Sequence, residues 1–290
     1  MQNLEVSAML SVLDFDLAGR AVPIAEPETF RLGMPHMCTS GVRRSWLLKE
    51  ACHRHWLSIA AQVGRRPSEF RDISGARIFA SVVACILDGD AARFREDDMC
   101  QLFMVEVPSA QTGWRSQFVL TSGTKTLGVE ILTSYARRNG PSNSELGAPE
   151  LFERFRDERD HAAARRAGLI RRIGRHDREL AVRDEAPPHI TFEINEDAHL
   201  NGVGLVYFAH IHDMIERAER NAVPEYVGTY PMRNRRAHFY GNLDVGDRLE
   251  ITARARARSL SPNPSVVVHS HARRASDGQV IACAESIYAR

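Results

Sequence analysis

The feature that most constrains the fold of this chain is an internal repeat. Segments 38–48 and 199–209 have the same order of small and aromatic residues. Their alignment pairs Gly41 with Gly202, Val42 with Val203 and Trp46 with Tyr207, and further along the chain it pairs Phe79 with Tyr240. The offset in numbering is the same at both ends of the alignment (202 − 41 = 240 − 79). This constant offset predicts that the chain consists of two similar structural units.

Each unit is expected to contain one long helix followed by strands. The helices are predicted at 46–63 and 205–220, where apolar residues surround much of the helix, as is typical of a helix buried by a sheet. Alternating and β-branched residues predict strands at 77–87, 101–107, 116–121 and 127–135, and again at 235–243, 248–258, 265–273 and 280–288. One helix against consecutive antiparallel strands is the hot-dog arrangement. Two copies predict an α+β double hot-dog fold.

A charged connector is expected between the units. We place the first unit at 1–140, the connector at 141–188 and the second unit at 189–290. The connector follows a turn-rich run at 139–144 and ends at Pro187-Pro188. Its many Arg, Glu and Asp residues and few apolar ones predict one or two exposed helices with i,i+4 ion pairs. A surface that binds phosphate or a carrier protein is the alternative.

Composition excludes several classes of protein. The 290 residues carry a net charge of only +1, so no global field favours nucleic acid or a membrane. No apolar stretch approaches the roughly 18 residues of a spanning helix, and the N-terminus lacks the basic region of a signal peptide. The five cysteines are scattered and form no CxxC pair. We therefore expect a cytoplasmic protein with reduced thiols and no metal.

The turn before each predicted helix is a candidate substrate site. The first amides of a helix lack internal partners and carry partial positive charge, so they can stabilise a developing oxyanion. Gly41 and Gly202 would let a ligand approach the backbone, and Ser40 and Asn201 are expected to cap the helices. The neighbouring Val42 and Val203 complete the predicted substrate-binding turns. The alternative is that these residues only cap and turn the chain.

Three residues are candidates for catalysis: Asn201, His199 and Glu50. Glu50 lies in an otherwise apolar part of the first helix, where loss of hydration would raise its pKa into a range useful for proton transfer. Across the interface between the units, His199 and Asn201 are expected to meet it over a bound thioester. The alternative is that Glu50 points to solvent beside Lys49 and Arg54.

Further candidates lie in the strands and helices of the second unit. Arg233 and Arg235 alternate on one strand face and are expected to hold the phosphates of coenzyme A or phosphopantetheine, unless they are ordinary surface arginines. Tyr240 is a further candidate for substrate binding. The His210-x-His212 pair is a poor metal site, because residues two apart on a helix point in different directions.

The same segments resemble a known family. Met34–Met37, Gly41-Val42, Trp46–Glu50, His53–Trp56 and Asn201–Phe208 are similar to the double hot-dog acyltransferase/decarboxylase family of leinamycin-type polyketide biosynthesis. The resemblance covers residues 30–290. It implies an enzyme that decarboxylates methylmalonyl-CoA and passes the acyl group to an acyl carrier protein, with no dissociable cofactor. That family uses a first-unit tyrosine, but the only tyrosine there is Tyr135, outside the matching segments. Either the hydroxyl comes from another residue, for example Tyr207 or Tyr240, or the reaction differs from that of the family.

The sequence thus favours an acyl-thioester enzyme whose partners are acyl-CoA and an acyl carrier protein. A hot-dog thioesterase or dehydratase that uses His199 or Glu50 as its base is the first alternative. The second is a non-catalytic protein that holds an acyl thioester. Association into a homodimer is a further expectation for this fold.

Overall fold

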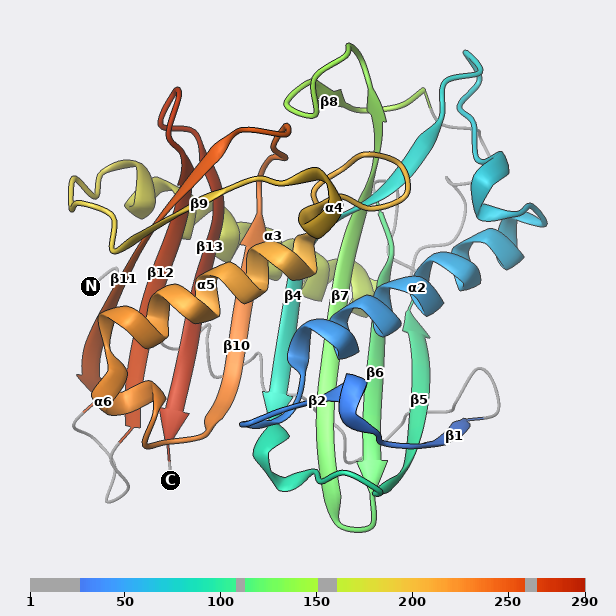
Figure 1. Cartoon of the computed structure of the whole chain (residues 1–290). Coiled ribbons are helices and arrows are strands. Elements are labelled where there is room, and N and C mark those ends of the chain that lie inside the picture. The colour runs from blue at the N-terminus through green and yellow to red at the C-terminus, as the bar shows by residue number, and fades with distance from the viewer. Residues whose placement is uncertain (1–26, 108–112, 151–160, 259–264, 290) are drawn as a thin grey trace.

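A computed structural model describes residues 27–107, 113–150, 161–258 and 265–289. Their main feature is one large antiparallel sheet with the strand order β1-β5-β6-β7-β4-β10-β13-β12-β11-β9 (Figure 1). A short strand, β8 (Leu146–Gly147), pairs with β7 outside this order. None of the helices in these ranges is long and apolar enough to cross a membrane.

In the described residues, the first unit contributes five strands to the large sheet and has one long helix. Its strands are β1 (Glu28–Arg31), β4 (Ile78–Gly89), β5 (Met99–Val107), β6 (Arg115–Ser122) and β7 (Lys125–Arg138). Helix α2 (Arg44–Val63) lies across one face of these strands (Figure 1). A small hairpin, β2 (Met37–Cys38) with β3 (Gly41–Val42), immediately precedes the helix. Single turns η1 (Met34–His36), η2 (Pro67–Glu69) and η3 (Ala91–Arg93) complete the unit.

The second unit repeats this plan. Its strands are β9 (Ile190–Glu193), β10 (Met232–Phe239), β11 (Arg248–Arg258), β12 (Ser265–Arg274) and β13 (Val280–Ala289). Helix α5 (Phe208–Ala222) lies on the same side of the sheet as α2, between the short helices α4 (Glu196–His199) and α6 (Pro224–Val227). The strand order β9-β11-β12-β13-β10 repeats the order β1-β5-β6-β7-β4. The predicted double hot-dog fold is confirmed.

The units join edge to edge in the middle of the sheet. Strands β4 and β10 pair antiparallel, from Asp88 opposite Asn234 to Ala84 opposite His238. Helices α2 and α5 also contact each other above this seam. Each helix therefore comes close to the loops that precede the helix of the other unit.

The order of elements is the same in the two units, but the numbering offset between corresponding elements is not constant. The offset is larger between the starts of the two long helices (208 − 44) than between the starts of β4 and β10 (232 − 78). The segments that connect the elements differ in length, and α2 has 20 residues against 15 in α5. The prediction of a duplicated fold was correct, while its residue-by-residue alignment was wrong.

Helix α3 (His161–Val182) belongs to the connector and lies behind the sheet, on the side opposite α2 and α5 (Figure 1). Ala167, Ile170 and Ile173 follow one another at helical spacing and are at most 3% exposed, because they pack on the sheet. Arg166 forms an ion pair with the buried Glu130 of β7. The prediction of an exposed helix is therefore wrong for this face of α3, because one sparse apolar stripe is sufficient to bury one helix face. Leu151 and Phe155, two apolar residues of the connector, lie outside the described residues.

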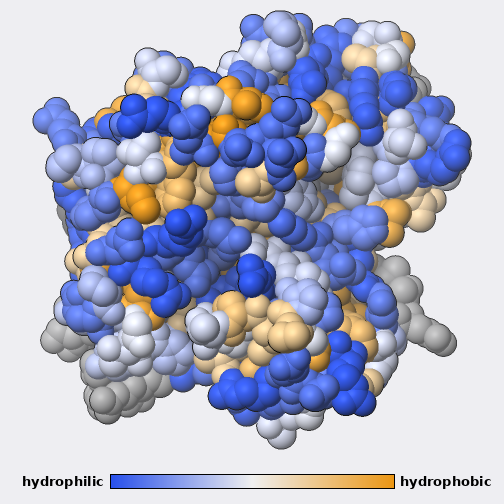
Figure 2. All heavy atoms as spheres, viewed as in Figure 1, coloured by the Kyte–Doolittle hydropathy of each residue, from blue (hydrophilic) through white to orange (hydrophobic). Residues whose placement is uncertain are grey.

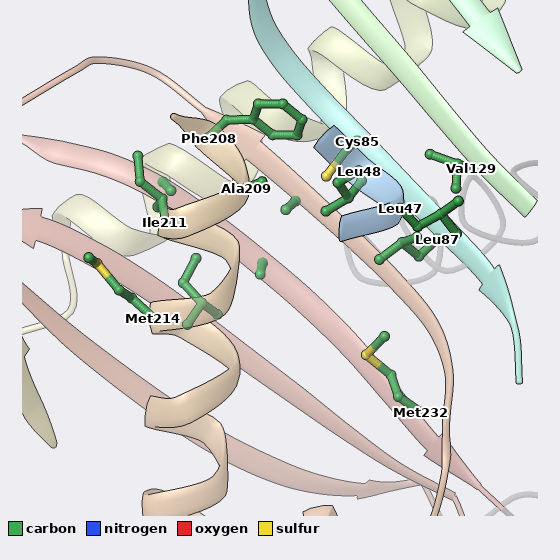
Figure 3. Close-up of a cluster of buried hydrophobic side chains, with 14 of the residues drawn as sticks. Leu47, Leu48, Cys85, Leu87, Val129, Phe208, Ala209, Ile211, Met214 and Met232 are labelled. Atoms are coloured by element: carbon green, nitrogen blue, oxygen red, sulfur yellow. The ribbon is translucent and has the colours of Figure 1, made fainter. Parts of the chain in front are cut away.

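The main core lies between the sheet and the two long helices. Leu47 and Leu48 of α2 and Ile211 of α5 are almost fully buried there (Figure 3). Phe208 packs edge-on against Phe239 of β10, with ring centroids 5.6 Å apart. Each such side chain contributes about 1.5–3 kcal/mol when fully buried. The core fixes both helices on the sheet and thereby positions their first turns.

Candidate functional site

A cavity of about 420 Å³ lies where α2 of the first unit meets the turn before α5 of the second. We call it the first cavity. Helix α2 contributes Cys52, His53 and Trp56, and strand β4 closes one side. The second unit contributes residues 201–203 and 205–208 together with Phe239 and Asn242. Both units are needed to form its wall.

The turn before α5 is held open by two asparagines. The side-chain oxygen of Asn201 accepts hydrogen bonds from the amides of Val203 and Leu205, both at 3.1 Å. The Asn242 side chain accepts from the amide of Val206 at 2.9 Å and donates to its carbonyl at 3.0 Å. Asn201 was predicted to cap α5, which is wrong, because Tyr207 occupies the N-cap position. Asn201 instead shapes the cavity wall.

Gly202 and Val203, for which the sequence predicts substrate binding, both line the first cavity. A Cβ atom added at Gly202 would meet no atom within 4 Å, so this backbone borders open space. The positive φ angle of this turn falls on Gly204, at 75°. Gly202 therefore leaves room for a ligand, whereas Gly204 serves the conformation of the turn.

The start of α5 carries positive electrostatic potential. No side chain caps this helix start, so the first amides have no side-chain partner there. The ammonium nitrogen of Lys49 on α2 lies 6.0 Å from the centroid of the Tyr207 ring. The helix dipole and the lysine act in the same direction, and together they favour negative charge at this end of the cavity.

Cys52 and Tyr207 meet across the cavity wall in a hydrogen bond between their side chains. Burial raises the pKa of the Cys52 thiol to about 11, so the thiol is protonated at neutral pH. Burial and the nearby Cys52 and Glu50 also raise the pKa of Tyr207. The cavity therefore contains a neutral hydroxyl and a neutral thiol rather than a reactive thiolate.

A second cavity, of about 400 Å³, occupies the corresponding place in the other unit. Residues 9, 10 and 13 of α2 line the first cavity, and residues 9, 10 and 13 of α5 line the second. In α2 these are Cys52, His53 and Trp56; in α5 they are Glu216, Arg217 and Arg220. The two cavities are thus related by the duplication but differ in chemistry.

The start of α2, beside the second cavity, has a carboxyl group next to it, whereas the start of α5 has a lysine nearby. Asp213 of α5 hydrogen-bonds Ser45 in the first turn of α2, and burial raises the pKa of this carboxyl. Asp213 is residue 6 of its helix, as Lys49 is of α2. The start of α2 therefore has a carboxyl group hydrogen-bonded within its first turn, while a lysine lies near the start of α5. The charge of Lys49 also opposes the rise in the pKa of Asp213, and Glu50 also acts on Tyr207, so the two helix starts differ mainly in their nearest charged partner. This difference favours the start of α5 as the place for an oxyanion.

The predicted substrate-binding residues of the first unit do not form such a site. Gly41 has a φ of 100°, and a Cβ there would lie 2.0 Å from the carbonyl oxygen of Ala91. Val42 is fully buried in the core. Ser40 does not cap α2, because Arg43 is the N-cap residue; Ser40 lines the second cavity instead. The backbone of η3 fills the space that a ligand would need at Gly41.

The three predicted catalytic residues are not brought together. His199 lines the second cavity, and its Nδ1 accepts a hydrogen bond from the Asn195 amide at 2.9 Å. Glu50 accepts a hydrogen bond from Arg54 at 2.8 Å and does not line the first cavity. Of the three, only Asn201 lies in the first cavity. The expectation that Glu50 loses its hydration in an apolar pocket is wrong, because it is 30% exposed and ion-paired.

The three strand residues predicted to bind substrate have other partners. Arg235 is fully buried and forms an ion pair with Glu219, so it cannot reach a phosphate from solvent. Arg233 donates to Asp90 at 2.6 Å. The Tyr240 hydroxyl donates to the carbonyl of Gly174 in α3 at 2.6 Å, on the opposite side of the sheet. Arg235 and Tyr240 are therefore not placed to hold a phosphate or an acyl group, whereas phosphate binding by Arg233, whose side chain is 36% exposed, stays a prediction.

Sequence reasoning missed His53, Trp56 and Asn242 as residues of the first cavity. A helical signal for the first two was present, since Lys49, Cys52, His53 and Trp56 follow the i, i+3, i+4, i+7 spacing of one helix face. Asn242 comes from a loop after β10, where no sequence periodicity indicates which way a side chain points.

Comparisons with solved structures show the same fold. A 12:0-ACP thioesterase from Umbellularia californica aligns with a TM-score of 0.63 at 8% identity, covering 91% of this chain and 94% of that one. A putative oleoyl thioesterase from Lactobacillus plantarum gives 0.59 at 11%, covering 93% and 96%. An acyl-ACP thioesterase from Bacteroides thetaiotaomicron gives 0.57 at 10%, covering 90% and 96%. No family model and no curated protein matches the chain. The likeness establishes the double hot-dog fold.

Proposed function

We propose that this protein is an acyl-thioester enzyme that works in the first cavity. The observation that carries the proposal is the coincidence of an uncapped helix start, a nearby lysine and a partly apolar cavity large enough for a short acyl group. A thioester carbonyl placed at the start of α5, beside Phe208, has its developing negative charge stabilised by the partial positive charge of that helix end. The acyl group then occupies the space beside Gly202.

Among thioester reactions, we favour decarboxylation of an alkylmalonyl-CoA with transfer of the acyl group to an acyl carrier protein. The bond between the α-carbon and the carboxylate breaks, and its electron pair moves into an enolate whose oxygen lies at the start of α5. Carbon dioxide leaves, and a proton is added to the α-carbon. The carrier thiol then attacks the carbonyl carbon and coenzyme A leaves as the thiol.

The lining of the first cavity agrees with this chemistry. The described residues that line it include no Asp or Glu. A carboxylate there would repel the carboxylate of the substrate. A hydrolase that uses a carboxylate as its base would need one. Decarboxylation itself needs oxyanion stabilisation and a site of low polarity, but no base. His53 is the side chain placed to accept a proton from the incoming carrier thiol.

A second candidate function is hydrolysis of the thioester. His53 also favours this reaction, because an imidazole in the cavity can take a proton from water. The three structural neighbours described above bear thioesterase names, which agrees with this alternative without deciding it.

One experiment separates the two. Methylmalonyl-CoA and propionyl-CoA are each incubated with the protein, with and without a phosphopantetheinylated acyl carrier protein, and the products are identified by mass spectrometry. We expect carbon dioxide and a propionyl-carrier thioester from methylmalonyl-CoA. Free acid and coenzyme A from both substrates would establish hydrolysis instead. Unchanged substrates in every incubation would contradict both functions and leave a binding protein.

A further inference from the structure

The second cavity plays no part in the proposed reaction, yet it keeps the volume of the first. It opens near the helix side of the molecule, whose visible face is mostly hydrophilic with isolated hydrophobic patches (Figure 2). Its charged lining consists of four arginines and two carboxylic acids: Arg43, Arg44, Arg217 and Arg220, with Asp213 and Glu216. Cations exceed anions by two (4 − 2) when its histidines are neutral.

The two carboxylic acids already have partners. Glu216 accepts a hydrogen bond from Arg44 at 3.1 Å, and it also lies 3.6 Å from the buried Arg235. These cations lower the pKa of Glu216, so it stays ionised and its charge is used within the protein. Asp213 is hydrogen-bonded to Ser45. Glu216 also pairs with Arg220 at 3.8 Å, so its single negative charge is shared among three arginines and the lining keeps an excess of positive charge.

Two arginines are placed to bind a ligand. The guanidinium carbon of Arg217 lies 4.9 Å from the centroid of the Phe192 ring, and this contact restrains its plane. The Arg220 side chain is 48% exposed and lies 3.8 Å from Glu216. Guanidinium groups bind phosphate oxygens through paired N–H donors, which makes them better phosphate ligands than single-point cations.

The histidines of the cavity add neutral donors. Burial lowers the pKa of His210 to about 4, and burial together with Arg217 lowers the pKa of His199. Both rings are therefore neutral at pH 7. Because Nδ1 of His199 accepts the Asn195 amide, its neutral ring carries the hydrogen on Nε2 and can donate it to an oxygen.

We propose that the second cavity binds a phosphate-bearing small molecule, with Arg217 and Arg220 as its main ligands. Duplication produced two related cavities, and exchange of Cys52, His53 and Trp56 for Glu216, Arg217 and Arg220 made the second one anion-binding. The phosphate belongs either to the nucleotide end of coenzyme A or to a separate phosphorylated metabolite. Only the first source rests on the proposed function.

The test uses the full-length protein and inorganic pyrophosphate as probe, with binding measured by isothermal titration calorimetry. We expect the double variant Arg217→Gln/Arg220→Gln to weaken pyrophosphate binding at least about tenfold, because it removes two cations and their charged hydrogen bonds to phosphate oxygens. The single variant Arg220→Gln, at a half-exposed side chain, should weaken it in the same direction. The matched control is Arg172→Gln/Arg175→Gln, two exposed arginines of α3 on the other side of the sheet.

Unchanged binding in the double variant, or an equal loss in the α3 control, would overturn the proposal. Competition with coenzyme A then decides the source of the phosphate. If coenzyme A binds in the second cavity, it displaces pyrophosphate. If the cavity binds a separate phosphorylated metabolite, pyrophosphate stays bound when coenzyme A is added. Both results of the competition support the site. Because the readout is binding and not turnover, failure of the proposed reaction would not be confused with failure of this site.

Discussion

His55 of α2 and Glu219 of α5 occupy the same position, residue 12, in the two long helices, and both are fully buried against the sheet. His55 hydrogen-bonds Ser116 of β6 at 2.6 Å and Thr133 of β7 at 2.9 Å. Glu219 accepts from Ser270 of β12 at 3.0 Å and from Ser286 of β13 at 2.9 Å. The polar group is neutral in one unit and charged in the other, where the buried Arg235 compensates it.

Replacement of the charged residue, Glu219, should lower the free energy of unfolding more than replacement of the neutral residue, His55. We expect Glu219→Gln to lower the free energy of unfolding by about 3–5 kcal/mol, because it leaves the charge of Arg235 buried without its main partner. His55→Asn removes only neutral hydrogen bonds and should cost about 1–3 kcal/mol. Urea unfolding of both variants measures the difference. Equal losses would contradict the assignment of an ionised pair to the second unit.

The neutral residue at this helix position, His55, should make the stability of the protein depend on pH. Burial lowers the pKa of His55 to about 3, whereas an unfolded histidine titrates near 6.5. Between these values the unfolded state binds the proton and the folded state does not, so stability falls as the pH decreases from about 6.5 toward 3.

In this window His55 contributes a slope of at most about 1.4 kcal/mol per pH unit to the free energy of unfolding. Urea unfolding between pH 4 and 7 should therefore show a shallower pH dependence for His55→Gln than for the parent protein. His271→Gln is the control variant. Burial lowers the pKa of His271 to about 4, but this histidine lies in strand β12 and not in α2 or α5. Identical slopes for His55→Gln and the parent would show that His55 is not the group that titrates.

Gly41 and Gly202 are paired in the sequence repeat but should respond differently to a methyl group. At Gly41, a Cβ would collide with the backbone of Ala91 and the φ of 100° is unfavourable, so Gly41→Ala should destabilise the fold by at least about 1–3 kcal/mol. Gly202→Ala should leave stability within about 0.5 kcal/mol. Its effect should appear in KM, because the added group projects into the first cavity. Thermal unfolding and steady-state kinetics of the two variants test this directly.

Lys49 and Glu50 are neighbours on α2 with different partners: Lys49 lies over the ring of Tyr207, and Glu50 is paired with Arg54. Lys49→Gln removes a cation beside the start of α5 and should lower turnover about tenfold, less than the 10²–10³ lost with a direct oxyanion donor. Glu50→Gln should leave turnover within about threefold, because Glu50 is occupied by Arg54. Steady-state rates with the active thioester substrate provide the measurement. A larger loss for Glu50→Gln would restore the sequence-based view of that carboxylate as a catalytic group.

Two adjacent arginines of α3 test how the connector is held. Arg166 contacts both oxygens of the buried Glu130, at 2.9 and 2.6 Å, while Arg165 is exposed. Arg166→Gln should lower the free energy of unfolding by about 1–3 kcal/mol, since Glu130 retains Arg115 as a partner. Arg165→Gln should change it by less than about 0.5 kcal/mol. Equal values in urea unfolding would show that the Arg166 ion pair does not anchor α3.

The sequence predicted the strands of the second unit well, because alternation is strong where one face of a strand is buried. Strand β11 has the predicted bounds, 248–258. The short edge strands β1 and β9 were missed, since so few residues give little periodic signal.

Alignment of the two units failed at the level of single residues. Sequence comparison placed Cys38 opposite His199, but the structural counterpart of His199 is His36. Nδ1 of each histidine accepts a backbone amide, that of Gly33 or Asn195, at 2.9 Å. Turn lengths differ between the units, so a gap-free alignment shifts the register. For the same reason the predicted site includes the turn that borders the first cavity, but its predicted partner on the opposite helix, Glu50, does not line that cavity.

The pairing of β4 with β10 has a consequence for how the protein behaves on dilution. A cavity formed between two separate subunits is lost when the subunits dissociate, so its occupancy depends on protein concentration. Here both walls of the first cavity belong to one chain and are held by hydrogen bonds between two central strands. Specific activity should therefore be constant over the whole range of protein concentration in which a single molecule stays folded.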